Sequence, residues 1–98
     1  MREVVVALGS NLGAPDQNVL KAMGCLAKQF PEGFRASEIY RTEPVDMTDD
    51  ATDFANAVVA FKSGLPLEAF FQSYKRLRRS LVVQKIMEKI RRGPWILI

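Results

Sequence analysis

The fold of this chain depends first on residues 4–13, which read Val4-Val5-Val6-Ala7-Leu8-Gly9-Ser10-Asn11-Leu12-Gly13. The run begins with β-branched and other apolar residues, a composition typical of a central strand that is covered on both faces. Gly9, Ser10 and Asn11 then supply turn chemistry, because glycine tolerates positive φ and the polar side chains bond to nearby backbone. Pro15 and Asp16 are typical of the start of a helix, which we expect from Pro15. A strand, a short loop and a helix N-terminus can together hold a polar ligand, although many such junctions are only connections.

The composition indicates one ordinary globular domain that covers residues 1–98, with 48% hydrophobic and 26% charged residues. The sequence has no histidine, which excludes Ser-His-Asp and Cys-His catalysis and zinc sites with histidine ligands. We expect no metal site made by the chain alone. The single cysteine, Cys25, fits a reducing compartment, and no apolar run is long enough to cross a membrane. We therefore expect a cytoplasmic protein with no membrane partner.

Charge is distributed unevenly along the chain. Residues 1–61 hold five Lys/Arg and nine Asp/Glu, whereas residues 62–98 hold nine Lys/Arg and two Asp/Glu. A basic C-terminal third indicates an anionic partner such as a phosphate, a nucleotide or a nucleic acid. A solvated helix face explains the same residues equally well, and both interpretations stay open.

Hydrophobic periodicity and turn signals predict the remaining elements. In order, they are a helix over 15–29, strands over 34–40 and 54–61, a helix from about 66, and a short strand over 95–98. Helix propensity continues to residue 90, although Val82-Val83 could interrupt the second helix. Four aspartates between Asp46 and Asp53 lack the spacing of a calcium loop and predict a solvated loop of the kind that serves as a lid. The order strand, helix, strand, strand, helix, strand predicts an α+β, ferredoxin-like βαββαβ sandwich. Its sheet is antiparallel and both helices pack on one face.

Asn56 is the unusual residue of the predicted strand over 54–61, because its neighbours are apolar. A buried amide must be satisfied, so it bonds either to neighbouring backbone or to a ligand. Phe54 projects to the same face, where its ring either covers a flat heterocycle or belongs to the core.

Three separated motifs resemble the 6-hydroxymethyl-7,8-dihydropterin pyrophosphokinase family in both order and spacing. They are Ala7-Leu8-Gly9-Ser10-Asn11-Leu12-Gly13, Tyr40-Arg41-Thr42-Glu43-Pro44-Val45 and Asp53-Phe54-Ala55-Asn56-Ala57-Val58-Val59. The resemblance implies transfer of pyrophosphate from ATP to the hydroxymethyl group of the reduced pterin. It implies a pterin site made by Thr42, Pro44, Val45, Phe54 and Asn56. Gly9, Ser10 and Asn11 would form a structural loop near it.

The C-terminal part departs from the family pattern. The family uses Mg²⁺ and ATP, and it holds two magnesium ions with an Asp-x-Asp pair that follows a Gly-Pro. Here Gly93-Pro94 is followed by Trp95-Ile96-Leu97-Ile98, and no aspartate occurs after Asp53. Arg91 and Arg92 remain as possible phosphate contacts, and no catalytic residue is assigned. We therefore expect the chain to be catalytically incomplete, either as a truncated homologue or as a sequence with missing residues.

Two other classes of protein compete with this interpretation. One is a ferredoxin-like RNA-binding module, but the strand over 54–61 lacks the basic and aromatic signature of such modules, so a nucleic-acid partner is not expected. The other is a non-catalytic interaction domain that pairs through the strand over 95–98. The expected partners are ATP and a reduced pterin, and the expected state is a monomer or a weak dimer.

Overall fold

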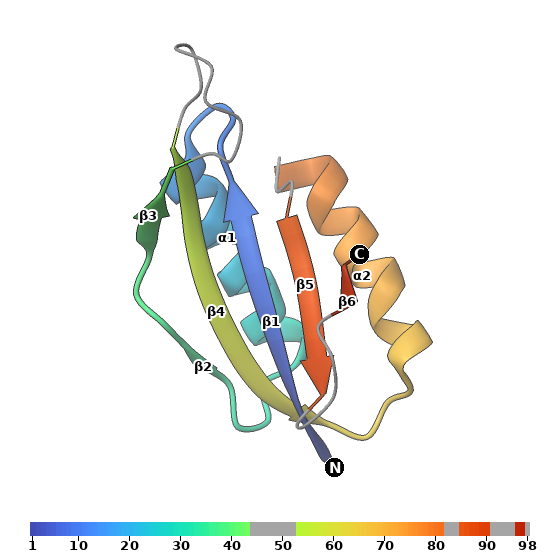
Figure 1. Ribbon diagram of the computed structural model, residues 1–98. Helices are drawn as coiled ribbons and strands as arrows, with labels where there is room; N and C mark the ends of the chain where they lie inside the picture. The colour runs from blue at the N-terminus through green and yellow to red at the C-terminus, as the bar shows by residue number, and fades with distance from the viewer. Residues whose placement is uncertain (44–52, 82–84, 91–95, 98) are drawn as a thin grey trace.

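The computed structural model describes residues 1–43, 53–81, 85–90 and 96–97 (Figure 1). Two helices and six strands follow one another along the chain. In order, they are β1 (Arg2–Ser10), α1 (Pro15–Gln29), β2 (Arg35–Ala36), β3 (Tyr40–Thr42), β4 (Phe54–Ser63), α2 (Leu67–Leu81), β5 (Lys85–Ile90) and β6 (Ile96–Leu97).

β1 lies at the centre of one antiparallel sheet. The strand order is β2-β4-β1-β5-β6, and β3 pairs with β4 beyond the end of β2. Val4 lies opposite Phe61 of β4 on one side and opposite Ile90 of β5 on the other. The prediction that residues 4–8 form a central strand is confirmed.

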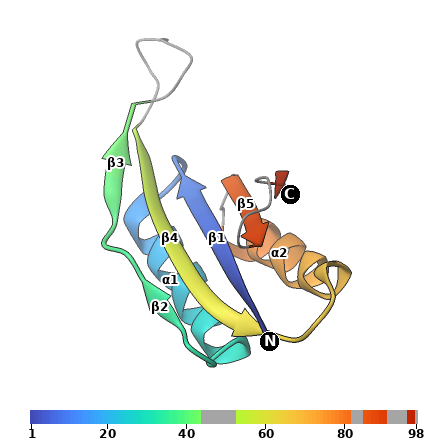
Figure 2. The same cartoon turned by 60° about the horizontal axis from the view of Figure 1, so that its bottom comes forward.

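Both helices pack on the same face of this sheet. Buried apolar side chains alternate along β1 and β4, and together with Ile86 of β5 they meet buried side chains of α1 and α2 in one cluster. Phe30, at the end of α1, stacks on Phe61 of β4 with ring centroids 4.6 Å apart. Phe70 of α2 contacts both of these rings edge-on. This aromatic group joins the two helices to the sheet, and Figure 2 shows both helices on one side of it.

The architecture is therefore the ferredoxin-like α+β sandwich that the order of elements predicted, and α1 has the predicted bounds. The prediction for the second half was wrong in one respect. α2 ends at Leu81, and residues 85–90 form β5 instead of continuing the helix. β5 pairs with the free edge of β1, so backbone pairing there outweighs the helix propensity of the segment. The predicted strand over 95–98 is present as β6 over Ile96–Leu97, paired with β5.

The predicted strand over 34–40 is divided into β2 and β3. Ser37, in the break between them, still pairs with β4 because its backbone N–H donates to the Val58 carbonyl at 2.8 Å. The Val58 N–H donates to the Ser37 hydroxyl oxygen at 2.9 Å, so a side chain replaces a backbone acceptor. The hydroxyl thus keeps the edge of the sheet attached to β4 where its regular pairing stops.

Two expectations about β1 need correction. First, β1 continues through Gly9 and Ser10, and the positive φ of 61° belongs to Gly13, so the turn comes later than Gly9. Second, β1 is not fully covered on both faces, because Val5 and Ala7 are half-buried whereas Val4, Val6 and Leu8 are buried. The sheet thus has one face covered by helices and one helix-free face.

Neither helix in the described part of the chain is long and apolar enough to cross a membrane.

Candidate functional site

Asn56 lies in β4 where that strand is paired with both β1 and β3. Tyr40 of β3 and Gly9 of β1 both lie opposite Asn56 in the register. Ala55 and Ala57 belong to the core, so Asn56 projects to the helix-free face, with 7% of its surface exposed. Residues directly opposite each other in antiparallel strands share a face, so Tyr40, Asn56 and Gly9 form one row across it. Gly9 contributes no side chain to this row.

The Asn56 amide has a fixed orientation. Its nitrogen Nδ2 donates to the Thr42 hydroxyl at 2.8 Å, to the Phe54 carbonyl at 3.2 Å and to the Tyr40 carbonyl at 3.3 Å. Two of these acceptors are backbone carbonyls, which cannot donate, so the atom that faces them must be the amide nitrogen. The carbonyl oxygen Oδ1 accepts no hydrogen bond from any described residue and is not sealed from solvent. Oδ1 is therefore the polar atom of Asn56 that keeps its hydrogen-bonding capacity.

Thr42 and Phe54 complete the described part of the site. They lie opposite each other in the register and so share a face with Asn56. Thr42 is exposed, Phe54 is half-buried, and neither belongs to the buried core. The structure therefore brings together three of the five residues that the resemblance assigned to the pterin.

The other predicted contacts lie outside the described residues. They are Pro44, Val45, the loop up to residue 52, Arg91 and Arg92. Asp53 is described and exposed.

The predicted loop near the site has a different organisation from the one expected. Gly9 and Ser10 belong to β1, and Ser10 is fully buried on the helix-covered face. The Asn18 side chain of α1 donates to the Ser10 hydroxyl at 3.1 Å and to the Leu12 carbonyl at 2.9 Å. Asn18 thus ties the end of β1 and the following loop to the helix. Sequence reasoning missed it, although an asparagine inside a helix is a signal for a local polar role.

The N-terminus of α1 carries an ion pair. Asp16 lies in the first helical turn, and its carboxylate accepts from the Arg41 guanidinium of β3 at 2.9 Å. A carboxylate at this position already complements the helix dipole, so a second anion is not favoured there. The pair joins β3, which holds two of the three acceptors of the Asn56 amide, to the helix that follows β1. No pattern in the sequence predicts this ion pair between Asp16 and Arg41.

A shallow hollow lies along the same face and edge of the sheet. Val58 and Ala60, the next residues of β4 on the side of Asn56, line it together with Arg35, Ala36 and Ser37 of the edge segment and Val59. Its volume is about 250 Å³, and Asn56 itself does not line it. The hollow near Asn56 is therefore small and mostly apolar, and the row formed by Tyr40, Asn56 and Gly9 lies at one end of it.

Comparison with known proteins adds a family and a fold. The family model of 7,8-dihydro-6-hydroxymethylpterin-pyrophosphokinase matches residues 5–95. No curated protein matches the chain. Among solved structures, formyltetrahydrofolate deformylase from Burkholderia mallei has a similar fold, with a TM-score of 0.56 and 14% sequence identity. The similarity covers 92% of this chain but only 28% of the deformylase chain, and at this identity it supports the fold alone.

Proposed function

Because the chain belongs to the 7,8-dihydro-6-hydroxymethylpterin-pyrophosphokinase family, we propose that it binds a reduced pterin beside Asn56 for pyrophosphate transfer from ATP. The family is one of transferases in folate biosynthesis. ATP is the second substrate in this proposal, and it rests on the family alone.

The proposal that the chain binds a pterin rests on one observation, the orientation of the Asn56 amide. Its nitrogen is committed to Tyr40, Thr42 and Phe54, so the accessible oxygen is an acceptor of known direction. A pterin has amino and ring N–H groups in one plane, and a fixed acceptor discriminates such a ring from one without donors at that position. Because the amide is already held, binding costs little further ordering of this side chain.

The Mg²⁺ that the family implies needs carboxylates beside the ATP phosphates, and one or two of them are enough. Among the described residues there is no group of three or more Asp, Glu, Cys or His side chains that could hold a metal ion without the phosphates. The sequence also has no aspartate after Asp53, where the family pattern has its Asp-x-Asp pair. We therefore derive no step through a metal, and the proposal concerns what this chain's own residues bind and orient.

Calorimetric titration with 6-hydroxymethylpterin, with and without ATP and Mg²⁺, tests the proposal. We expect Asn56→Ala to weaken pterin binding at least roughly 10-fold, because the pterin loses its acceptor and two backbone carbonyls lose their donor. Val58→Ala is the matched control, since Val58 is half-buried on the same face two residues along β4. Equal affinities of wild type and Asn56→Ala, or equal losses in both variants, would refute the proposed pterin site.

A further inference from the structure

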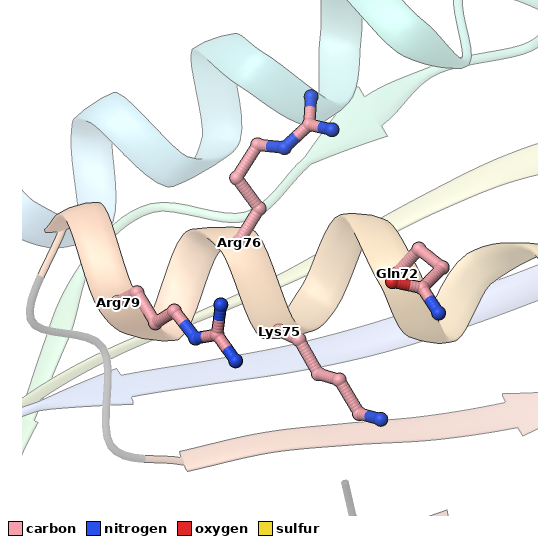
Figure 3. Close-up of a pocket in the computed structure, with 4 residues that line it drawn as sticks. All are labelled: Gln72, Lys75, Arg76 and Arg79. Carbon is pink, nitrogen blue, oxygen red and sulfur yellow. The ribbon is translucent and has the colours of Figure 1, made fainter.

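The outer surface of α2 carries a cationic stripe, defined here as Gln72, Lys75, Arg76 and Arg79. All four side chains are exposed, and together they line a hollow of about 350 Å³ (Figure 3). Their spacing of three or four residues places them on neighbouring turns of one side of the helix. The opposite side of α2 is buried in the core through Phe70, Tyr74 and Leu77, so the stripe faces away from the sheet.

The charge of the stripe exceeds what helix stability explains. α2 contains Lys75, Arg76, Arg78 and Arg79 against a single acidic residue, Glu68. Arg78 and Arg79 lie in the last turn, where cations complement the helix dipole. Lys75 and Arg76 lie further from that end, and no salt bridge between described residues engages Lys75 or Arg79. The dipole therefore accounts for only part of the stripe.

The side chains of the stripe spread apart. Figure 3 shows Arg76 extending on the side of α1 and Lys75 on the side of β5, with Arg79 further along the helix. Cations that converge on one point suit a single phosphate group, whereas cations spread over a surface suit a row of phosphates. An anionic membrane is a poorer fit, because an interfacial helix inserts an apolar face that α2 has already buried in the core.

We propose that the α2 cationic stripe binds the phosphodiester backbone of a nucleic acid. The stripe has no aromatic residue for base stacking, so recognition is by backbone charge and independent of base sequence. This surface differs from the sheet face on which ferredoxin-like RNA-binding modules stack bases, so the absence of their signature does not count against it. The inference does not depend on pterin binding, because the stripe and Asn56 belong to different elements on opposite sides of the sheet.

Salt dependence gives the proposal a quantitative form. Three cations that each neutralise one phosphate release about three counterions, so log K should fall against log salt with a slope of about −2 for a single strand. The same three contacts on duplex DNA give a slope of about −2.7. Fluorescence anisotropy with a labelled oligouridine and with a labelled DNA duplex, each titrated at several salt concentrations, measures both slopes and distinguishes the two sources of phosphodiester.

The decisive variant replaces Lys75, Arg76 and Arg79 by Gln in one chain. The charge-matched control replaces Lys21, Lys28 and Lys62 by Gln, which removes the same charge from other exposed positions. We expect the first variant to lose at least roughly 10-fold in affinity and most of the salt slope, and the control to keep both. Circular dichroism of each variant checks that it is folded, and an unchanged pterin titration in the first variant separates this surface from the pterin site.

Three results would overturn the proposal. Absence of measurable binding at low salt would leave the stripe as a solvated helix face. Equal loss in the two triple variants would mean that net charge alone attracts the oligonucleotide. Tighter binding to vesicles of anionic phospholipid than to either nucleic acid, at the same salt concentration, would assign the stripe to a membrane surface.

Discussion

The Asn56 amide nitrogen donates to the Thr42 hydroxyl at 2.8 Å, and this bond joins two of the motifs that define the family resemblance. Thr42 belongs to β3 and Asn56 to β4, and they lie diagonally across the two strands, since Thr42 is opposite Phe54 and Asn56 is opposite Tyr40. The acceptor of the shortest of the three hydrogen bonds made by Nδ2 is therefore a side chain, and a substitution of Thr42 can remove it without altering the backbone.

Replacing Thr42 by Val removes this acceptor and keeps the shape of the side chain. We expect pterin affinity to fall roughly 2- to 10-fold, because a neutral hydrogen bond contributes about 0.5–1.5 kcal/mol and Asn56 loses part of its orientation. Thr42→Ser keeps the oxygen and should bind like wild type. Calorimetric titration of the three proteins measures the difference, and equal affinities in all three would show that the hydroxyl does not orient Asn56.

Asn18→Ala removes the two hydrogen bonds that tie Ser10 and Leu12 to α1. We expect a loss of about 1–3 kcal/mol in the free energy of unfolding, because the buried Ser10 hydroxyl and a loop carbonyl each lose the hydrogen bond from Asn18. Asn18→Asp should be at least as damaging, since a carboxylate cannot donate to the Leu12 carbonyl. Urea unfolding measures both, with Gln17→Ala, an exposed neighbour in the same helix, as the control.

Gly13 and Gly24 respond to alanine in opposite directions. Gly13 has a φ of +61°, so Gly13→Ala should destabilise the protein by about 1–2 kcal/mol through backbone strain. Gly24 lies inside α1, and a Cβ added there meets no atom within 4 Å, so Gly24→Ala should stabilise by about 0.5–1 kcal/mol. Thermal and urea unfolding give both signs, and a shift in the same direction for the two variants would contradict this account.

The Asp16–Arg41 pair should contribute little to stability although it joins two elements. Both side chains are about half exposed, at 52% and 50%, and such pairs typically give coupling energies of about 0.2–1 kcal/mol. A double-mutant cycle with Asp16→Ala and Arg41→Ala measures the coupling. It should shrink as salt is raised, and a larger coupling that is insensitive to salt would contradict the assignment as a surface pair.

Pyrophosphate transfer by residues 1–98 alone should be negligible. No aspartate follows Asp53, so the carboxylate pair that holds the metal ions in the family pattern has no counterpart in this sequence. The measurement is AMP formation from ATP and Mg²⁺ with and without 6-hydroxymethyl-7,8-dihydropterin. AMP release that depends on the pterin would contradict the prediction and show that other residues supply this role.

The fold was predictable wherever the pattern was local. The apolar run over 4–8 and the helical spacing over 15–29 each specify an element, and both were predicted correctly. The strand over residues 85–90 was not predicted, because Lys, Met and Glu favour a helix. Pairing with the free edge of β1 stabilises the strand, and this edge exists only in the folded sheet. The division of the strand over 34–40 also depends on a distant partner, since the Ser37 hydroxyl bonds to Val58 of β4.

The candidate site shows the same limit. Asn56 could be singled out from the sequence because an amide in an apolar strand must be satisfied, and Phe54 because it lies on the same face of that strand. The direction of the amide could not be predicted, because it is set by carbonyls of Tyr40 and Phe54 that meet only in the folded sheet. The Asp16–Arg41 pair joins residues far apart in the sequence, and no local pattern indicates such a contact.

The central position of β1 has a consequence for synthesis. Its hydrogen-bonding partners are β4 and β5, so after its synthesis β1 stays unpaired until Phe54–Ser63 and Lys85–Ile90 have also been made. At about 5–20 residues per second, several seconds pass before both exist. Such long-range pairing slows folding. Until both partner strands are present, the apolar run of β1 is exposed and prone to aggregation, which makes it a segment for chaperones to bind.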